Sequence, residues 1–245
     1  EWNDYAGLDV KGKVVAVMVN DPGLHDSSTF KGKVLTYSAR WTYKFEEAAR
    51  QGAAGVLLIH TDESATYPWG TVEGSATGRQ VRLESAPTSL KVTGWVQHDM
   101  MARAFTAAGA DLDQAMAEAG KRGFVGSELS IRVAASVRST LTRTEIFNVL
   151  GRLPGNGGPL AKEAVVLGAH YDHLGIAKPV DGDSIYNGAR DNAAGVGEML
   201  AIAEALNRAE LSGKRSIIFA AFGGEEAGLL GSQAMIDRPF MPLRM

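Results

Sequence analysis

Two apolar segments of strand length are separated by one long segment with helical periodicity. The apolar segments cover residues 164–169 and 216–222, and the segment that favours a helix covers residues 192–208. Continuous apolar runs of this length are typical of strands that are buried on both faces of a sheet. A further helix is expected over residues 229–236. This alternation of strands and helices predicts an α/β domain with a doubly wound sheet.

The first half of the chain carries shorter elements. Strands are expected over residues 14–19, 55–60 and 90–96, and helices over residues 43–51, 100–108 and 112–119. The polar residues 61–87 are expected to form an extended surface segment. Residues 128–137 alternate polar and apolar side chains, which predicts a half-exposed antiparallel strand.

A domain boundary is expected near Thr140, where the character of the sequence changes. It gives domains over residues 1–139 and 140–245, and a strand is expected over residues 145–153 of the second. The length of 245 residues is sufficient for two small domains, and the hydrophobic content of 45% excludes wholesale disorder.

The composition excludes several classes of protein and site. The formal net charge of −3 lacks the basic surplus that a nucleic-acid-binding protein carries. No apolar run approaches the roughly 18 residues that a membrane-spanning helix needs. The absence of cysteine excludes disulfide scaffolds, thiolate zinc sites and cysteine nucleophiles. Because the chain begins with Glu1, any signal peptide would already be missing from it.

Three clusters of acidic and imidazole side chains lie directly after a strand or before a helix of the second domain. They cover residues 170–173, 190–192 and 223–226. Ligands of open α/β sheets gather beyond the carboxyl ends of the strands, so we expect the three clusters to converge there. Carboxylates in one crevice repel one another unless a cation neutralises them. Imidazole and carboxylate donors together fit a divalent ion, with zinc as the leading candidate.

Each of these side chains also has an interpretation without a metal. Asp191 alone is an ordinary N-cap for the helix that follows, and Glu225 and Glu226 alone are acids favoured in a first helical turn. His170 alone is a histidine satisfied in the core. The metal-site hypothesis therefore depends on the conjunction, because all of these alternatives would have to hold together at neighbouring strand ends.

Other residues around the clusters are assigned as follows. Asp172 is either a solvated loop acid or a residue that orients His170. His173 is treated as structural, because nothing demands a second imidazole at that spacing. The long connection over residues 174–190 is either the rim of a pocket or a surface insertion. Four glycines are expected where the backbone passes close to the site, namely Gly168, Gly195, Gly223 and Gly224.

Three motifs carry a resemblance to a known family. They are residues 168–175 (GAHYDHLG), residues 189–195 (ARDNAAG) and residues 224–232 (GEEAGLLGS), and in order and context they resemble the M28 family of zinc aminopeptidases. This resemblance covers roughly residues 140–245 and implies part of a zinc-peptidase-like, doubly wound mixed sheet. Residues 5–137 resemble the smaller α+β protease-associated (PA) domain that many of these enzymes carry, through residues 13–19, 41–47 and 52–60.

The resemblance implies a role for each residue of the clusters. His170 would bind one zinc ion, Asp191 would bridge two and Glu226 would bind the second. Glu225 would be the general base, and Asp172 would hold the imidazole of His170. A complete site would contain two Zn²⁺ ions.

Two further ligands of the family have no counterpart in this sequence. They are an Asp after the next strand and a His further along, and Asp237 lies too close to the preceding helix to replace the Asp. The family's catalytic segment before the inserted domain is also missing. We therefore interpret the chain as an internal portion of a longer enzyme and expect it to lack full activity alone.

The resulting hypothesis is a metallo-aminopeptidase that releases N-terminal residues from peptides. A one-zinc enzyme similar to glutaminyl cyclases is the first alternative, since it shares the fold but not the reaction. A receptor-like binding protein on the same scaffold is the second. The family implies peptide substrates and a secreted or periplasmic location, and no nucleic-acid partner is expected.

Overall fold

The structure is a computed structural model that describes residues 2–76, 79–85, 89–210 and 212–242. The chain divides into two compact units. The first unit comprises residues 1–79 and 87–139, and the second comprises residues 80–86 and 140–245. Among the described residues, no helix is both long and apolar enough to cross a lipid bilayer.

The first unit is built on a three-stranded parallel sheet. Its strands, in the order β1-β3-β4, are β1 (Val14–Met18), β3 (Gly55–His60) and β4 (Val92–Gln97). The helices around it are α1 (Trp41–Arg50), α2 (Asp62–Ala65), α3 (Trp69–Ala76), α4 (His98–Ala107) and α5 (Leu112–Ala119). A short strand β2 (Phe30–Lys33) and a 3₁₀ turn (Pro22–Leu24) lie between β1 and α1.

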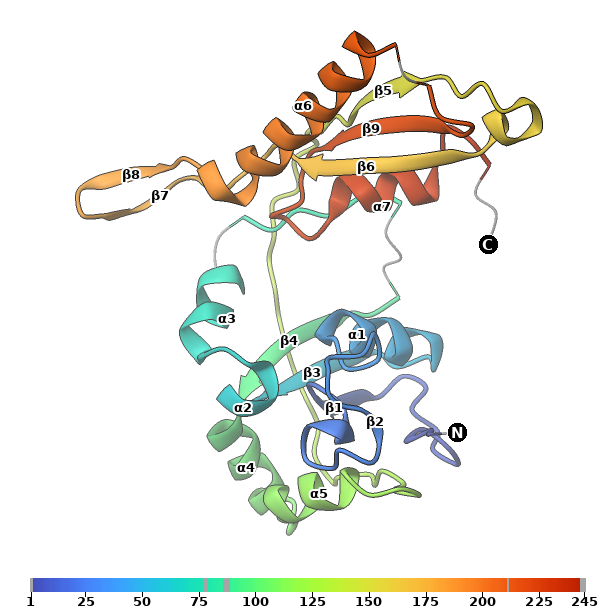
Figure 1. Cartoon of the computed structure of the whole chain (residues 1–245). Coiled ribbons are helices and arrows are strands. Elements are labelled where there is room, and N and C mark those ends of the chain that lie inside the picture. The colour runs from blue at the N-terminus through green and yellow to red at the C-terminus, as the bar shows by residue number, and fades with distance from the viewer. Residues whose placement is uncertain (1, 77–78, 86–88, 211, 243–245) are drawn as a thin grey trace. The chain divides into compact units, whose positions relative to one another are not determined.

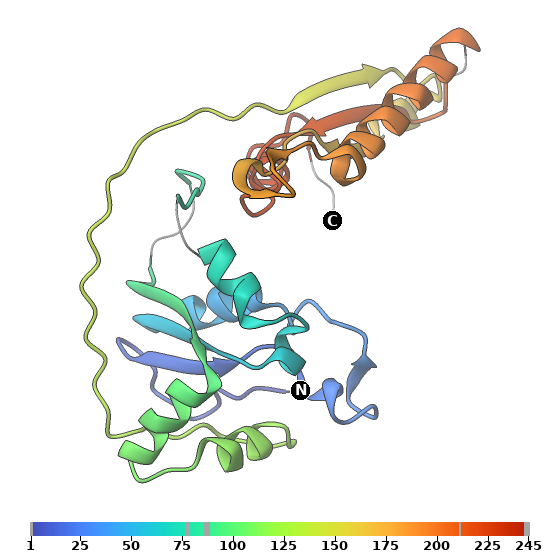
Figure 2. The same cartoon turned by 90° about the vertical axis from the view of Figure 1, so that its left-hand side faces the viewer.

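The central strand β3 supplies side chains to two apolar clusters. Val56 and Leu58 are completely buried in a cluster that includes Ala48 of α1. Ile59 instead packs with Phe105 of α4 in a second cluster. Successive side chains of a strand point to opposite faces, so the two clusters lie on the two sides of the sheet, with helices on both sides (Figure 2).

Two expectations for the first unit are wrong. The polar segment after β3 is not simply extended, because it contains α2 and α3, and the hydroxyl of Thr61 caps α2 by accepting from the N–H of Ser64 at 3.1 Å. Part of that segment lies outside the described residues. Residues 128–137 form no strand either, since no neighbouring strand pairs with them, although Leu129 packs against the second cluster.

The second unit contains a mixed three-stranded sheet in the order β5-β9-β6. Strand β9 (Ser216–Phe222) pairs antiparallel with β5 (Val149–Leu153) and parallel with β6 (Ala164–His170). Helix α6 (Ala194–Arg208) connects β6 to β9, and α7 (Leu230–Asp237) follows β9. Figure 1 shows α6 and α7 on opposite faces of the sheet, which confirms the doubly wound arrangement. A 3₁₀ turn (Gly158–Lys162) precedes β6.

The prediction that both faces of the sheet are buried is wrong for β6. Val165 and Val166 are 49% and 46% exposed. Within the part of the chain that the structure describes, β6 has one neighbour and forms an edge of the sheet. Two helices cover only part of so small a sheet, which leaves these valines in contact with solvent.

The connection after β6 contains a hairpin, which was not expected from the sequence. Its strands are β7 (Gly175–Val180) and β8 (Asp183–Tyr186), joined by the two-residue turn Asp181-Gly182. Both turn residues have a positive φ, 51° at Asp181 and 86° at Gly182. An Asp-Gly pair of this kind is a strong short-range hairpin signal, so the sequence did contain the information.

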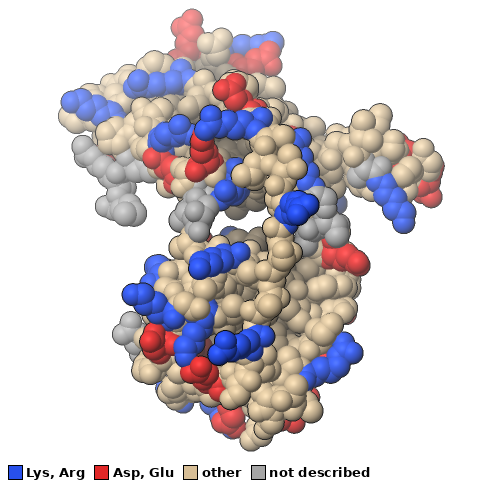
Figure 3. Space-filling view, turned by 180° about the vertical axis from the view of Figure 1, so that it is seen from behind, with Lys and Arg blue, Asp and Glu red and all other residues tan. Residues whose placement is uncertain are grey.

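Basic and acidic side chains are intermixed on the surface. Figure 3 shows Lys and Arg scattered among Asp and Glu over the visible face of each unit. This distribution follows from the nearly balanced composition of 25 basic and 28 acidic residues.

Candidate metal centre

The carboxyl ends of the parallel strands β6 and β9 bring the first polar residues of the site together. His170 is the last residue of β6 and lies opposite Phe222, the last residue of β9. The chain turns immediately after Phe222, so Glu225 and Glu226 stand beside His170. The expected convergence of these two clusters beyond the strand ends is therefore what the structure shows.

The third cluster reaches the same place from the segment before α6. Asp191 lies in the π-helical turn Ala189–Ala193 with a backbone that is not helical, and the Asp191–Asn192 peptide bond is cis. Its Oδ1 lies 2.9 Å from Nε2 of His170. Asp191 is not the cap of α6: the side chain of Asn192 accepts the N–H of Gly195 at 3.1 Å instead.

His170, Asp191 and Glu226 form a set of candidate metal ligands. Each offers one donor atom, and the three atoms lie within 4.8 Å of one another. The imidazole is buried, with 10% of its side chain exposed, whereas the carboxylate of Asp191 is 70% exposed. One nitrogen and two carboxylate oxygens that converge in this way fit a divalent ion such as zinc.

The tautomer of His170 suits metal binding. Its Nδ1 lies 3.0 Å from the main-chain carbonyl oxygen of Asp172, which can only accept, so Nδ1 carries the proton. In the neutral ring Nε2 then holds the free lone pair, and Nε2 is the atom that faces Asp191. A bond from one ring N–H to a backbone carbonyl is a common way to orient a ligating histidine.

The carboxylate of Asp172 has a partner other than the imidazole. Its Oδ1 accepts the main-chain N–H of Glu225 at 3.1 Å, and its Oδ2 accepts that of Glu226 at 3.2 Å. The same carboxylate stays 3.9 Å from Nδ1 of His170. Asp172 therefore bonds the imidazole through its backbone and the Glu225–Glu226 turn through its side chain.

Glu225 stands beside the three candidate ligands. Its Oε2 lies 3.6 Å from Nε2 of His170. Burial raises the pKa of Glu225, and the charges of Glu226, Asp191 and Asp172 raise it further against the opposing effect of His170. A carboxylate whose pKa is raised toward neutrality, next to a metal site, is suited to accept and return a proton.

The pKa of His170 is also shifted. Burial, the largest single effect, lowers it, but the hydrogen bond to the carbonyl of Asp172 and the charges of Glu225 and Asp191 together raise the pKa above its ordinary value of 6.5. Surrounding carboxylates thus favour a positive charge at the centre of the cluster. A divalent cation meets the same electrostatic demand.

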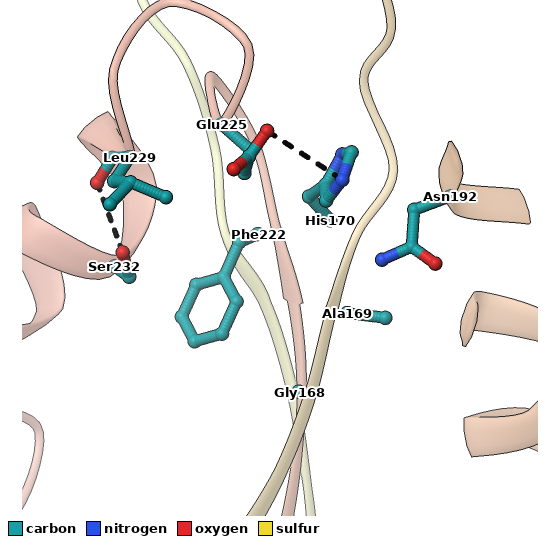
Figure 4. Close-up of a pocket in the computed structure, with 8 residues that line it drawn as sticks. All are labelled: Gly168, Ala169, His170, Asn192, Phe222, Glu225, Leu229 and Ser232. Carbon is teal, nitrogen blue, oxygen red and sulfur yellow. Dashed lines mark hydrogen bonds and ion pairs between the residues drawn. The ribbon is translucent and has the colours of Figure 1, made fainter. Parts of the chain in front are cut away.

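A pocket of about 230 Å³ opens beside the cluster. Its lining residues are Gly168, Ala169, His170, Asn192, Phe222, Glu225, Leu229 and Ser232. Figure 4 shows the carboxylate of Glu225 facing the imidazole of His170, with the ring of Phe222 and the side chain of Leu229 to one side. The pocket therefore combines a polar wall with an apolar one.

Glycine is required at two positions close to the site, because a larger residue would collide with neighbouring atoms. A Cβ atom on Gly223 would lie 2.8 Å from the carbonyl oxygen of Phe147, and one on Gly195 would lie 2.4 Å from Oδ1 of Asn192. Both distances are shorter than a carbon atom tolerates. The prediction that the backbone passes closely at these glycines is confirmed for this pair.

His173 contacts the site, which was not expected from the sequence. The sequence predicts a structural role for His173, and in the structure its Nδ1 lies 2.6 Å from Oε1 of the candidate ligand Glu226. The two residues are 53 positions apart. Its position in the same strand-end cluster as His170 was the available signal, but only the fold shows which carboxylate it meets.

Comparison with known proteins shows what this unit is similar to. Residues 148–243 match the family described as peptidase family M28. The chain is 35% identical to leucine aminopeptidase 1 of Trichophyton rubrum over 108 residues, which is 42% of this chain and 27% of that protein. It is 38% identical to a probable zinc metalloprotease of Pyrenophora teres f. teres over 88 residues, which is 36% of this chain and 18% of that protein.

A probable zinc metalloprotease of Pyrenophora tritici-repentis is 36% identical over 88 residues, or 36% of this chain and 19% of that protein. The matched segment spans less than a third of the length of each of these three relatives. His170, Asp191, Glu225 and Glu226 all lie within the family match. Residues 148–243 of this chain are therefore similar to peptidase family M28.

Proposed function

We propose that the second unit is the zinc-binding part of a metallo-aminopeptidase that hydrolyses N-terminal residues from peptides. The observation that carries the proposal is the convergence of His170, Asp191 and Glu226, whose donor atoms lie within 4.8 Å of one another beside Glu225. Relatives named leucine aminopeptidase and zinc metalloprotease support the reaction class and the metal.

In this proposal, His170, Asp191 and Glu226 would hold the metal. When bound, zinc supplies Lewis acidity, which polarises a peptide carbonyl and lowers the pKa of a water molecule. Glu225 accepts at its carboxylate a proton from the attacking water molecule and returns it to the departing amine. Its raised pKa brings the carboxylate closer to the working pH for both steps.

The proposal also covers the role of the first unit and the cellular location of the protein. The resemblance of residues 13–19, 41–47 and 52–60 to the protease-associated (PA) domain supports a role for the first unit as such a domain. Secretion or a periplasmic location is proposed on the family resemblance alone.

The decisive experiment is elemental analysis of zinc in the purified protein after equilibration with zinc and removal of the excess. We compare the unchanged chain with Glu226→Ala and with Glu198→Ala, an exposed glutamate on α6 that serves as the control. Zinc that is bound and then lost in Glu226→Ala alone supports the proposal. A single ion per chain is the expected stoichiometry, because two further ligands of the family have no counterpart in this sequence. A folded protein that binds no zinc contradicts the proposal and leaves a receptor-like binding protein.

A further inference from the structure

His173 makes a short, well-defined contact with one oxygen of Glu226. Nδ1 of the imidazole lies 2.6 Å from Oε1 of the carboxylate. Both side chains are mostly buried, with 22% and 23% of their surfaces exposed. The contact lies within the second unit, and His173 is not one of the three candidate ligands.

The backbone around His173 fixes the position of its ring. Gly188 has a φ of +63°, and a Cβ atom there would lie 2.8 Å from both Cβ and Cγ of His173. The ring of Tyr186 lies on another side, with 6.5 Å between ring centroids. A glycine at position 188 is therefore needed for the main chain to pass this close to the imidazole.

Glu226 is consequently held at two points. Its main-chain N–H donates to Oδ2 of Asp172 at 3.2 Å, and its carboxylate accepts from His173 through Oε1. A carboxylate has two oxygens and about four acceptor positions, so one oxygen can accept an N–H while the group still binds an ion. Such outer hydrogen bonds to a ligating carboxylate set its orientation and its metal affinity.

We propose that His173 is a positioning residue, whose Nδ1–H holds the carboxylate of Glu226 in the orientation in which it binds the metal. This inference rests on the proposed function, since it requires Glu226 to be a ligand. His173 itself touches neither the substrate nor the reacting atoms in this proposal. Its effect is exerted through Glu226 alone.

The test compares three substitutions of His173 in the full chain. His173→Phe keeps a ring beside Gly188 but removes the donor, His173→Ala removes both, and His173→Asn restores an N–H donor close to the place of Nδ1. Zinc affinity is measured by competition with a chromophoric chelator, and the visible absorption of bound Co²⁺ reports the ligand set. We expect the Phe and Ala variants to bind zinc about 10- to 100-fold more weakly, and the Asn variant to bind close to the unchanged protein.

His98→Phe is the matched control. It breaks a histidine–carboxylate contact of similar length, 2.7 Å between Nε2 of His98 and Oδ1 of Asp113, in the first unit. Thermal unfolding of every variant separates a loss of affinity from a loss of folding, and the Ala variant replaces the Phe variant if the latter does not fold.

Three results would overturn the inference. Unchanged zinc affinity in the Phe and Ala variants removes the positioning role but leaves the proposed function intact. Loss in the Asn variant equal to that in the Phe variant, with an altered Co²⁺ spectrum, makes His173 a ligand instead. If the unchanged protein binds no zinc, the proposed function fails and this inference fails with it.

Discussion

The carboxylate of Asp172 accepts the main-chain N–H of Glu225 at 3.1 Å through its Oδ1. Its second oxygen accepts the next N–H of the chain, that of Glu226, at 3.2 Å. One side chain after β6 thereby fixes the turn after β9, and this turn presents both glutamates of the site.

We expect Asp172→Asn to destabilise the second unit. An amide has one acceptor oxygen, so one of the two N–H groups in the turn loses its partner, at a cost of about 1–3 kcal/mol in the free energy of unfolding. Urea unfolding followed by circular dichroism measures this loss. Asp183→Asn is the control, because Asp183 accepts a single main-chain N–H from Ile185 in an exposed hairpin. Equal effects of the two substitutions would contradict the role of Asp172.

Two glycine-to-alanine substitutions should change the stability of the folded protein in opposite directions. A Cβ on Gly231 would lie 2.4 Å from both Oδ1 of Asn148 and the carbonyl oxygen of Gly223, so Gly231→Ala should destabilise the protein by about 1–3 kcal/mol. A Cβ on Gly197 in α6 meets nothing within 4 Å, so Gly197→Ala should stabilise it by about 0.5–1 kcal/mol through helix propensity. Thermal unfolding decides both, and a shift in the same direction for the two variants would count against the packing described here.

The pKa of His98 should fall when Asp113 is neutralised. A hydrogen bond from the His98 ring to Asp113 is the main cause that raises the pKa above 6.5, with Asp99 as a smaller one. Because the folded-state pKa is raised, the pair stabilises the fold fully below 6.5, and this contribution is lost as the pH rises through the folded-state pKa. The contribution is below about 1 kcal/mol because the pair is exposed.

NMR titration of the histidine rings measures this directly. Asp113→Asn should lower the pKa of His98. A His98 pKa that does not move would show that the contact with Asp113 is absent in solution.

Glu225→Gln should remove activity without removing metal. In the longer enzyme that the resemblance implies, the loss of the proton acceptor should slow hydrolysis of aminoacyl p-nitroanilides by about 10²- to 10⁴-fold. Glutamine keeps the size of the side chain, and Glu225 is not among the three candidate ligands, so the zinc content should be unchanged. Full activity in this variant would exclude Glu225 as the base, and loss of zinc would make it a ligand.

The elements with local signals were predictable from the sequence. The apolar run ending at His170 and that ending at Phe222 became neighbouring strands, and their shared edge brought the three polar clusters together. The strand expected over residues 128–137 failed because alternation fits a strand only where another strand offers an edge. The contact between His173 and Glu226 depends on the register of two strands, which no local pattern encodes.

The position of the proton on the His170 ring does not depend on which side chain stands at position 172. Its Nδ1 donates to a main-chain carbonyl, and every amino acid at position 172 would supply that same carbonyl. A complete set of substitutions at this position would therefore leave the imidazole tautomer in place and vary only the support of the Glu225–Glu226 turn. Substitutions at this position can therefore change the support of Glu225 and Glu226 without disturbing the histidine.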